Sequence, residues 1–373
     1  MSLPLGDLDL SELEGKKFIC DDRCGLCCIC QPELLPHEVE WFTLNYPQRI
    51  IEKKRPYRRT MLAVKRGYGS CTFLNESRRC EIYNVRPYHC RQFPFHTHIG
   101  RRVRVELNLS CRGVWYGGTE DAMALGKQLV CNNLDIARNV ISETREIYRD
   151  FEINCRDAGI YRSEEFLRKE MASKINFLSE LSYLAQILNL STEDEEMTLP
   201  SAPERSINTA ELKRTAMDLG LQSLSAENIS GAPVYCDPEW RWNLFVVKEE
   251  SLRWNILNDD GTLDVAGDIN PNDVKLLLPE DEGLEVFLSY IKTLNQRDSL
   301  MGYVNYLVDS YGYEDYISNT YFGVIATTAL DLLWRASLIA HLQGGKLDHA
   351  GMIEGIISYD MDRLDAPTIG AFL

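Results

Sequence analysis

The residues best suited to chemistry are cysteines, and they are crowded into the first third of the chain. Nine of the 12 cysteines lie between Cys20 and Cys111, and the first block has the spacing C-x3-C-x2-C-C-x-C. A thiolate is a soft ligand that suits zinc or the iron of an iron–sulfur cluster, and short spacings bring several sulfurs to one metal. The pattern therefore predicts a metal centre.

Adjacent cysteines limit how these ligands can be shared. The side chains of Cys27 and Cys28 point in different directions, so we expect them to serve two centres rather than one tetrahedral ion. With Cys30 set aside, eight candidates remain, enough for two four-sulfur sites. The predicted metal ligands are Cys20, Cys24, Cys27, Cys28, Cys71, Cys80, Cys90 and Cys111. Three nearby histidines could replace a sulfur: His89, His96 and His98.

Four blocks of this segment resemble the CxxCxxCC cysteine-cluster family. They begin at Cys24 (CGLCC), Cys71 (CTFL), Cys80 (CEIYNVRPYHCRQFPF) and Ser110 (SCRG), and in the last block Arg112 stands where proline is usual. The family is a zinc- or iron-chelating domain and includes flagellin lysine N-methylases. Over about residues 18–118 the resemblance thus implies a metal site, and it also raises the prospect of methyl transfer.

Two functions remain open. In the first, the cysteines hold one or two iron–sulfur clusters of the 4Fe-4S type, and the chain is an enzyme resembling lysine N-methylases, either a methyltransferase-like transferase or an oxidoreductase. It would act on a protein or small-molecule substrate, with S-adenosylmethionine as a further cofactor. In the second, the cysteines fold a zinc-stabilised interaction module or carry metal for delivery, without catalysis.

Three side chains near the cysteines are candidates for binding the cofactor or substrate. Arg86, Arg91 and Tyr83 could orient a carboxylate or balance the charge of a cluster. The alternative is structural, with the two arginines donating hydrogen bonds to carbonyl groups around the metal-binding loop.

The spacing of Cys20, Cys24 and Cys27 also matches that of radical S-adenosylmethionine enzymes. Leu26 stands where those enzymes usually have an aromatic residue, and Cys28 follows at once. The chain beyond lacks the alternating strands and helices of the barrel that accompanies this motif. We therefore do not expect that fold.

Composition and charge exclude some classes of protein. Residues 1–118 carry 19 Lys+Arg against 13 Asp+Glu, whereas the whole chain has a net charge of −16, so the remainder is strongly acidic. That remainder would repel a phosphate backbone, which disfavours nucleic-acid binding. The first 15 residues lack the basic start and apolar run of a signal peptide, so we expect a cytoplasmic protein whose cysteines bind metal rather than form disulfides.

The elements that must position the cysteines predict an α+β fold that is mainly helical. Residues 33–46 suit a short helix, 60–65 a strand, and 93–99 with 101–109 a hairpin turning at Gly100. Apolar and polar residues alternate along the second arm of the hairpin, so we expect one buried and one solvated face. We expect that arm to bring Cys111 close to Cys90.

The rest of the chain is predicted to be helices and a small sheet. Apolar periodicity predicts two long helices packed as a hairpin over about 123–141 and 167–188, a three-stranded meander over 242–248, 251–257 and 262–266, and helices over 284–295, 300–311 and 314–343. The expected domains are 1–118, 119–190 and 205–373, with the cysteines in the first. Outside the cluster, we interpret Cys131 and Cys155 as buried side chains and Cys236 as isolated.

One apolar stretch, residues 321–342, raises the question of a membrane span. Asp331, Arg335 and His341 interrupt it. A charge at the centre of a span costs several kcal/mol, whereas Asp331 and Arg335 are one helical turn apart and can pair in a core. We therefore expect a buried helix and no membrane span.

Overall fold

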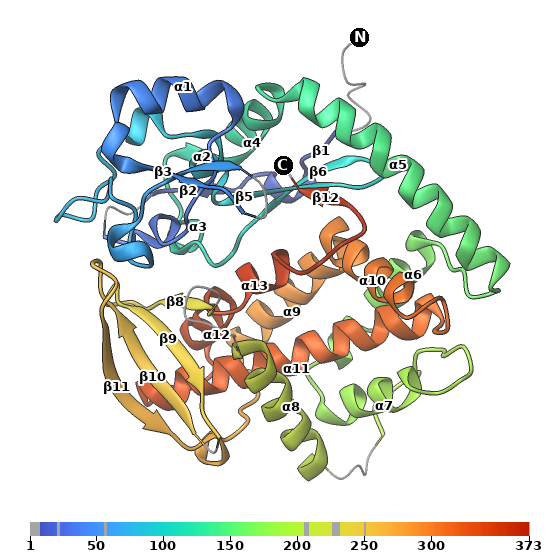
Figure 1. The fold of residues 1–373 in the computed structure, drawn as a ribbon. Helices are drawn as coiled ribbons and strands as arrows, with labels where there is room; N and C mark the ends of the chain where they lie inside the picture. Colours follow the sequence, from blue (N-terminus) through green and yellow to red (C-terminus); the bar gives the residue numbers. More distant parts are fainter. Residues whose placement is uncertain are drawn as a thin grey trace.

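Figure 1 shows the computed structural model of the chain, which describes residues 8–20, 23–55, 58–204, 209–225, 232–249 and 251–372. The fold is α+β and mainly helical, which confirms the predicted class. The cysteine-rich segment lies at the top left of the view, the antiparallel meander beside it at the lower left, and the helices fill the remainder.

The cysteine-rich segment is built from short elements around one hairpin. Its helices and strands are β1 (Leu8–Asp9), β2 (Lys17–Phe18), α1 (Pro36–Asn45), β3 (Ile50–Lys53), β4 (Arg59–Leu62), α2 (Tyr88–Gln92), β5 (Phe95–Ile99), β6 (Val103–Leu107), α3 (Arg112–Trp115) and β7 (Glu120–Asp121). The predicted helix, strand and hairpin are confirmed. A four-stranded sheet has the order β1-β6-β5-β12, in which β12 (Ala371–Phe372) comes from the other end of the chain.

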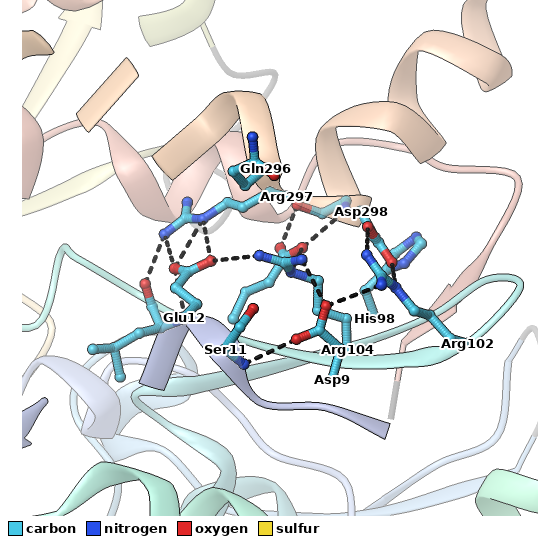
Figure 2. Close-up of polar contacts among 12 residues, drawn as sticks. Asp9, Ser11, Glu12, His98, Arg102, Arg104, Gln296, Arg297 and Asp298 are labelled. Carbon is cyan, nitrogen blue, oxygen red and sulfur yellow. Dashed lines mark hydrogen bonds and ion pairs between the residues drawn. The ribbon is translucent and has the colours of Figure 1, made fainter. Parts of the chain in front are cut away.

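The prediction of a solvated hairpin face is wrong. Arg104 and Glu106, on the polar face of β6, are 4% and 0% exposed. Figure 2 shows the reason: carboxylates from the N-terminal segment and the residues around the start of α10 (Asp298–Ser310) cover this face and pair with its arginines. Alternation of polar and apolar residues indicates two different faces, but a polar face can be buried when its charges are paired.

The ion pairs on this face connect segments that are far apart in sequence (Figure 2). Arg104 lies 2.9 Å from Asp9, and Arg102 lies 2.8 Å from Asp298. Arg297, fully buried, contacts Glu12 at 2.8 Å and Asp360 at 2.6 Å. The hairpin is therefore fixed to the helices by buried charge pairs as well as by apolar contacts.

The helical part begins with α4 (Ala122–Cys131) and α5 (Leu134–Asp157). Both expected long helices are interrupted: the first, over 123–141, is divided between α4 and α5. The second is divided into α6 (Glu164–Ala172), a 3-10 turn (Ile175–Phe177) and α7 (Leu181–Ser191). Serine hydroxyls compete with the helical hydrogen bonds at the breaks of the second. Ser173 donates to the carbonyl of Glu170 at 2.7 Å, and Ser179 donates to that of Asn176 at 3.3 Å.

The core is organised around α11 (Ile317–Gln343), which packs against several other helices, including α7, α8 (Thr209–Leu224) and α12 (His349–Ile357). The helix is long and apolar enough to cross a membrane, yet 89% of its apolar window is buried inside the protein. Asp331 and Arg335 pair at 3.3 Å, as predicted. Such burial is typical of a core helix. The remaining helices are α9 (Glu282–Gln296) and α13 (Asp360–Leu364).

The predicted meander is confirmed and has one further strand. Its strands are β8 (Val234–Cys236), β9 (Trp242–Val247), β10 (Leu252–Leu257) and β11 (Leu263–Ile269), in the order β11-β10-β9-β8. The additional strand, β8, ends at Cys236 and pairs antiparallel with β9. Its last residue lies beside the cysteine-rich segment, because the Sγ atom of Cys236 is 3.9 Å from that of Cys24.

Removing the buried guanidinium of Arg297 should destabilise the fold strongly. In an Arg297→Met variant, the carboxylates of Glu12 and Asp360 lose their cation while they stay buried, which costs about 3–5 kcal/mol. Urea denaturation of the purified chain measures this loss. The matched control is Arg253→Met, which breaks an exposed pair with Asp268 and should change the free energy of unfolding by less than about 1 kcal/mol. Equal effects of the two changes would contradict a structural role for the network.

The buried His98 should make stability depend on pH. Its Nε2 lies 3.2 Å from the hydroxyl of Thr368, and burial lowers the pKa of the imidazole to about 4. The unfolded chain binds a proton near pH 6.5 that the folded chain excludes, so the free energy of unfolding falls as the pH drops from 6.5 toward 4. The contribution is about 1.4 kcal/mol per pH unit.

The test compares the pH dependence of urea denaturation between variants. His98→Asn should reduce the slope below pH 6.5, whereas substitution of the exposed His37 should leave it unchanged. If His98→Asn keeps the wild-type slope, His98 is not the responsible group.

Candidate metal centre

The cysteines of the N-terminal segment surround one cavity of about 350 Å³. All eight predicted ligands line it, together with Cys30. Tyr83, Arg86 and Arg91 line it as well. The structure therefore brings together the eight candidate cysteines and the three candidate cofactor-binding residues, while their binding of a metal stays a prediction.

Backbone hydrogen bonds place the cysteines from separate loops. The amide of Cys71 donates to the carbonyl of Cys28 at 2.7 Å, which joins the second block to the first. An isolated bridge between Leu74 and Cys80 brings the third block alongside. Cys90 lies on α2, and Cys111 immediately precedes α3. These loops contain little regular secondary structure, so local turns bring the sulfur atoms together.

Electrostatic neighbours divide the thiols into two groups. In the first, burial raises the pKa of Cys71 to about 11, and the nearby thiols of Cys80 and Cys27 raise it further. Burial also raises the pKa of Cys90, with Cys71 among its neighbours. These thiols are neutral at pH 7, so a metal must displace their protons on binding.

The second group gathers around Cys24 and Cys111. Burial raises the pKa of Cys111, and the thiols of Cys24 and Cys20 act in the same direction. Cys27 influences both groups. The hydrogen bond with Cys28 lowers the pKa of Cys27 to about 7, and the guanidinium of Arg86 also lowers it. The two adjacent thiols thus lie within hydrogen-bonding reach of each other.

The three candidate binding side chains already make structural contacts. The guanidinium of Arg86 stacks on the ring of Tyr83 at 3.8 Å and donates from Nε to the Tyr83 carbonyl at 3.0 Å. Arg91 lies 3.9 Å from the carboxylate of Glu38. The structural alternative therefore describes the contact of Arg86, whereas Arg91 lies near a carboxylate instead of a carbonyl group. Each residue also contributes to the cavity wall.

The donor set fits a thiophilic metal. Among the residues that the structure describes, no group of three or more His, Cys, Asp or Glu side chains is close enough to hold a single ion. The cavity wall is instead rich in separate sulfurs, which are the ligands of zinc and of iron–sulfur clusters. By these groups, Cys71, Cys80 and Cys90 would hold metal on one side and Cys20, Cys24 and Cys111 on the other, while the adjacent Cys27 and Cys28 would serve one centre each. None of the three nearby histidines is among the residues lining this cavity.

One cysteine that the sequence left isolated belongs to this region. The Sγ atom of Cys236 lies 3.9 Å from that of Cys24. The two residues are 212 positions apart, so no spacing pattern could have linked them. The interpretation of Cys131 as buried is also wrong, since it is exposed, whereas the buried position of Cys155 is confirmed.

Comparison with known proteins agrees with this site. Residues 19–112 match the family model CxxCxxCC, described as "Putative zinc- or iron-chelating domain". No curated protein and no solved structure matches the chain. The match confirms the resemblance over the cysteine-rich segment and indicates zinc or iron as its metal. The residues beyond 112 lie outside the match.

Replacing a ligand of the first group should lower the metal content. Cys71→Ser removes a buried sulfur from the cavity wall, so we expect the variant to retain part of the wild-type metal if two centres are present. Elemental analysis after anaerobic purification measures the change. Cys131→Ser is the control, because Cys131 is exposed and is not among the cavity-lining residues. We also expect Cys30→Ser to keep the wild-type metal content. Full retention of metal by Cys71→Ser would remove Cys71 from the ligand set.

Proposed function

We propose that the chain is an iron–sulfur protein that modifies a protein or small-molecule substrate in the cytoplasm, with a reaction resembling that of lysine N-methylases. The observation that carries the metal part is the gathering of nine cysteines around one cavity of about 350 Å³. The reaction is inferred from the resemblance of the cysteine-rich segment.

The number and the spread of the cysteines favour a cluster over a single ion. Zinc holds four thiolates at about 2.3 Å each and leaves no room between them. A 4Fe-4S cluster brings its own iron and sulfide, so its protein ligands stand farther apart around a larger volume. The spread of the cysteines around this cavity, with no group of three or more described metal-binding side chains placed for one ion, supports the second arrangement.

The cavity also offers groups that could position a small molecule. Arg86 and Arg91 supply positive charge, and Tyr83 supplies an aromatic ring that is partly exposed. A carboxylate-bearing ligand such as S-adenosylmethionine could be oriented by these guanidinium groups. An iron that lacks a protein thiolate supplies a site for a ligand amine or carboxylate. Cys20 is exposed, so it is the cysteine that could most readily be left out of the ligand set of the cluster.

A non-catalytic metal module is the second candidate. It is favoured by the scarcity of regular structure between β4 and α2, where Cys71 and Cys80 lie. Loops of this kind are commonly held by metal, which then contributes directly to folding. In this case the helical part would bind a partner, and zinc rather than iron would occupy the cysteines.

Spectroscopy on anaerobically purified protein separates the two candidates. If the chain is an iron–sulfur enzyme, the purified protein should contain iron and acid-labile sulfide. Adding S-adenosylmethionine should then shift the electron paramagnetic resonance spectrum of the reduced cluster. Arg86→Gln should weaken this response, because it removes a positive charge from the cavity wall. Arg253→Gln, on the meander, should not change it.

Zinc without iron would leave the metal-module function as the better account. The same holds for an unchanged resonance together with no heat of binding in calorimetry.

A further inference from the structure

A second cavity, of about 340 Å³, lies at the turn of the hairpin formed by β5 and β6. Its wall combines residues of the hairpin with side chains from α5, α6 and α10. It has no lining residue in common with the cysteine cavity. Its volume lies in the range of about 300–1,000 Å³ that is usual for small-molecule sites. The cavity is therefore large enough for a small ligand and separate from the candidate metal centre.

Two buried polar side chains form the inner part of the wall. His98 is 0% exposed and Tyr148 is 3% exposed. The Nε2 atom of His98 is turned toward the hydroxyl of Thr368, at 3.2 Å. Its Nδ1 atom is buried and has no hydrogen-bond partner among the described residues. Because a buried polar atom without a partner is unfavourable, this nitrogen, on the other side of the ring, indicates a ligand that hydrogen-bonds to it.

Gly100 keeps this inner part of the wall open. A Cβ atom at Gly100 would lie 3.0 Å from the hydroxyl of Tyr148 and 3.2 Å from Cε1 of His98. Both distances are shorter than the optimal van der Waals separation of about 3.5–4.0 Å between carbon atoms. The missing side chain therefore leaves room beside both polar groups.

Two charged side chains of the wall pair only loosely with each other. The Nε atom of Arg101 lies 4.0 Å from the carboxylate of Glu164, and Arg168 lies 4.0 Å from it as well. Both distances exceed that of a hydrogen bond. Asp298, in the same wall, is instead held at 2.8 Å by Arg102 (Figure 2) and at 2.9 Å by Arg168. Glu164 is thus the carboxylate of this wall that can still accept a strong hydrogen bond.

The charges at this cavity define a zwitterionic ligand. Glu164 and Arg101 are both partly exposed and bear opposite charges 4.0 Å apart. They suit an ammonium and a carboxylate on one molecule, since both would form charge-assisted hydrogen bonds. Arg101 also pairs with Glu152 at 3.0 Å, which orients its guanidinium. A small amino acid carries these two groups on one carbon atom.

The inner part of the wall favours a polar end on the same ligand. An amide group both donates and accepts hydrogen bonds, so it can pair with Nδ1 of His98 in either tautomer of the imidazole. The hydroxyl of Tyr148 can serve the other side of the amide. Met301, also in the wall, offers apolar contact to the methylene groups between the two ends.

We propose that this cavity is a second binding site, for a small amino-acid zwitterion with a polar side chain. The ammonium group of the ligand binds Glu164, and its carboxylate binds Arg101. Its polar end binds His98 and Tyr148. The inference goes beyond the proposed function and does not rest on it, because the wall of this cavity contains no cysteine.

The test is calorimetric titration of the full-length chain with L-glutamine, a zwitterion with an amide end. We expect one saturable site. Two analogues of the same length probe the charges: glutaramic acid lacks the ammonium group, and 4-aminobutanamide lacks the carboxylate. Each should bind at least about 10-fold more weakly, because each loses one hydrogen bond between charged groups.

Three variants locate the bound molecule. Glu164→Gln should weaken binding of L-glutamine by at least about 10-fold and leave that of glutaramic acid unchanged, since this analogue has no ammonium group. Glu165→Gln is the matched control, because Glu165 is the next residue of α6, is exposed and does not line the cavity. Gly100→Ala fills space beside the polar end and should weaken all three probes. Glu164 is partly exposed, so its variant keeps the test decisive even if Gly100→Ala does not fold.

Three results would overturn the inference. The first is the absence of binding, by calorimetry and by thermal shift, at about 10 mM L-glutamine, a concentration that reveals even a millimolar Kd. The second is equal weakening by Glu164→Gln and Glu165→Gln. The third is binding of L-glutamine no tighter than that of its two analogues. The metal content of the chain decides the proposed function separately, so failure of one leaves the other in place.

Discussion

A buried carboxylate, that of Asp360, fixes the backbone that leads into the metal cavity. It accepts a hydrogen bond from the amide of Leu109 at 2.6 Å and another from the hydroxyl of Tyr290 at 2.8 Å, and it pairs with Arg297. Two residues after Leu109 the chain reaches Cys111. The position of the last cysteine of the cluster therefore depends on a residue near the other end of the sequence, on a helix of the main core.

The cysteine cluster could be predicted from the sequence because its information is local. Short spacings such as that of Cys24 and Cys27 indicate that the thiols bind the same metal, whatever the conformation of the loops between the blocks. So many thiols in one segment have few other uses. The gathering of the eight predicted cysteines around one cavity is consistent with that logic. The hairpin strands and the helices α9, α10 and α11 were also predicted well, because apolar periodicity lies within each element. The two long helices expected over 123–141 and 167–188 are each interrupted.

The errors concern contacts between distant segments. Charged residues on β6 indicate a solvated face when the strand is considered alone, yet Arg104 and Glu106 are buried by partners that lie in other parts of the sequence. For the same reason, no spacing pattern linked Cys236 to the cysteine cluster, because its neighbour Cys24 is 212 residues away. Neither contact could be inferred from composition or spacing, since both depend on the packing of the whole chain.

Arg112 occupies the position where the cysteine-cluster pattern usually has proline. A proline there would have no side-chain donor for the carbonyl of Cys236 or the carboxylate of Glu354, both of which Arg112 reaches. The arginine in place of proline therefore serves the contact with the meander and the helices, and not the cysteine cluster alone. In this chain the residue directly after the final cysteine therefore connects the cysteine-rich segment to a further layer of protein, so neither layer is complete without the other.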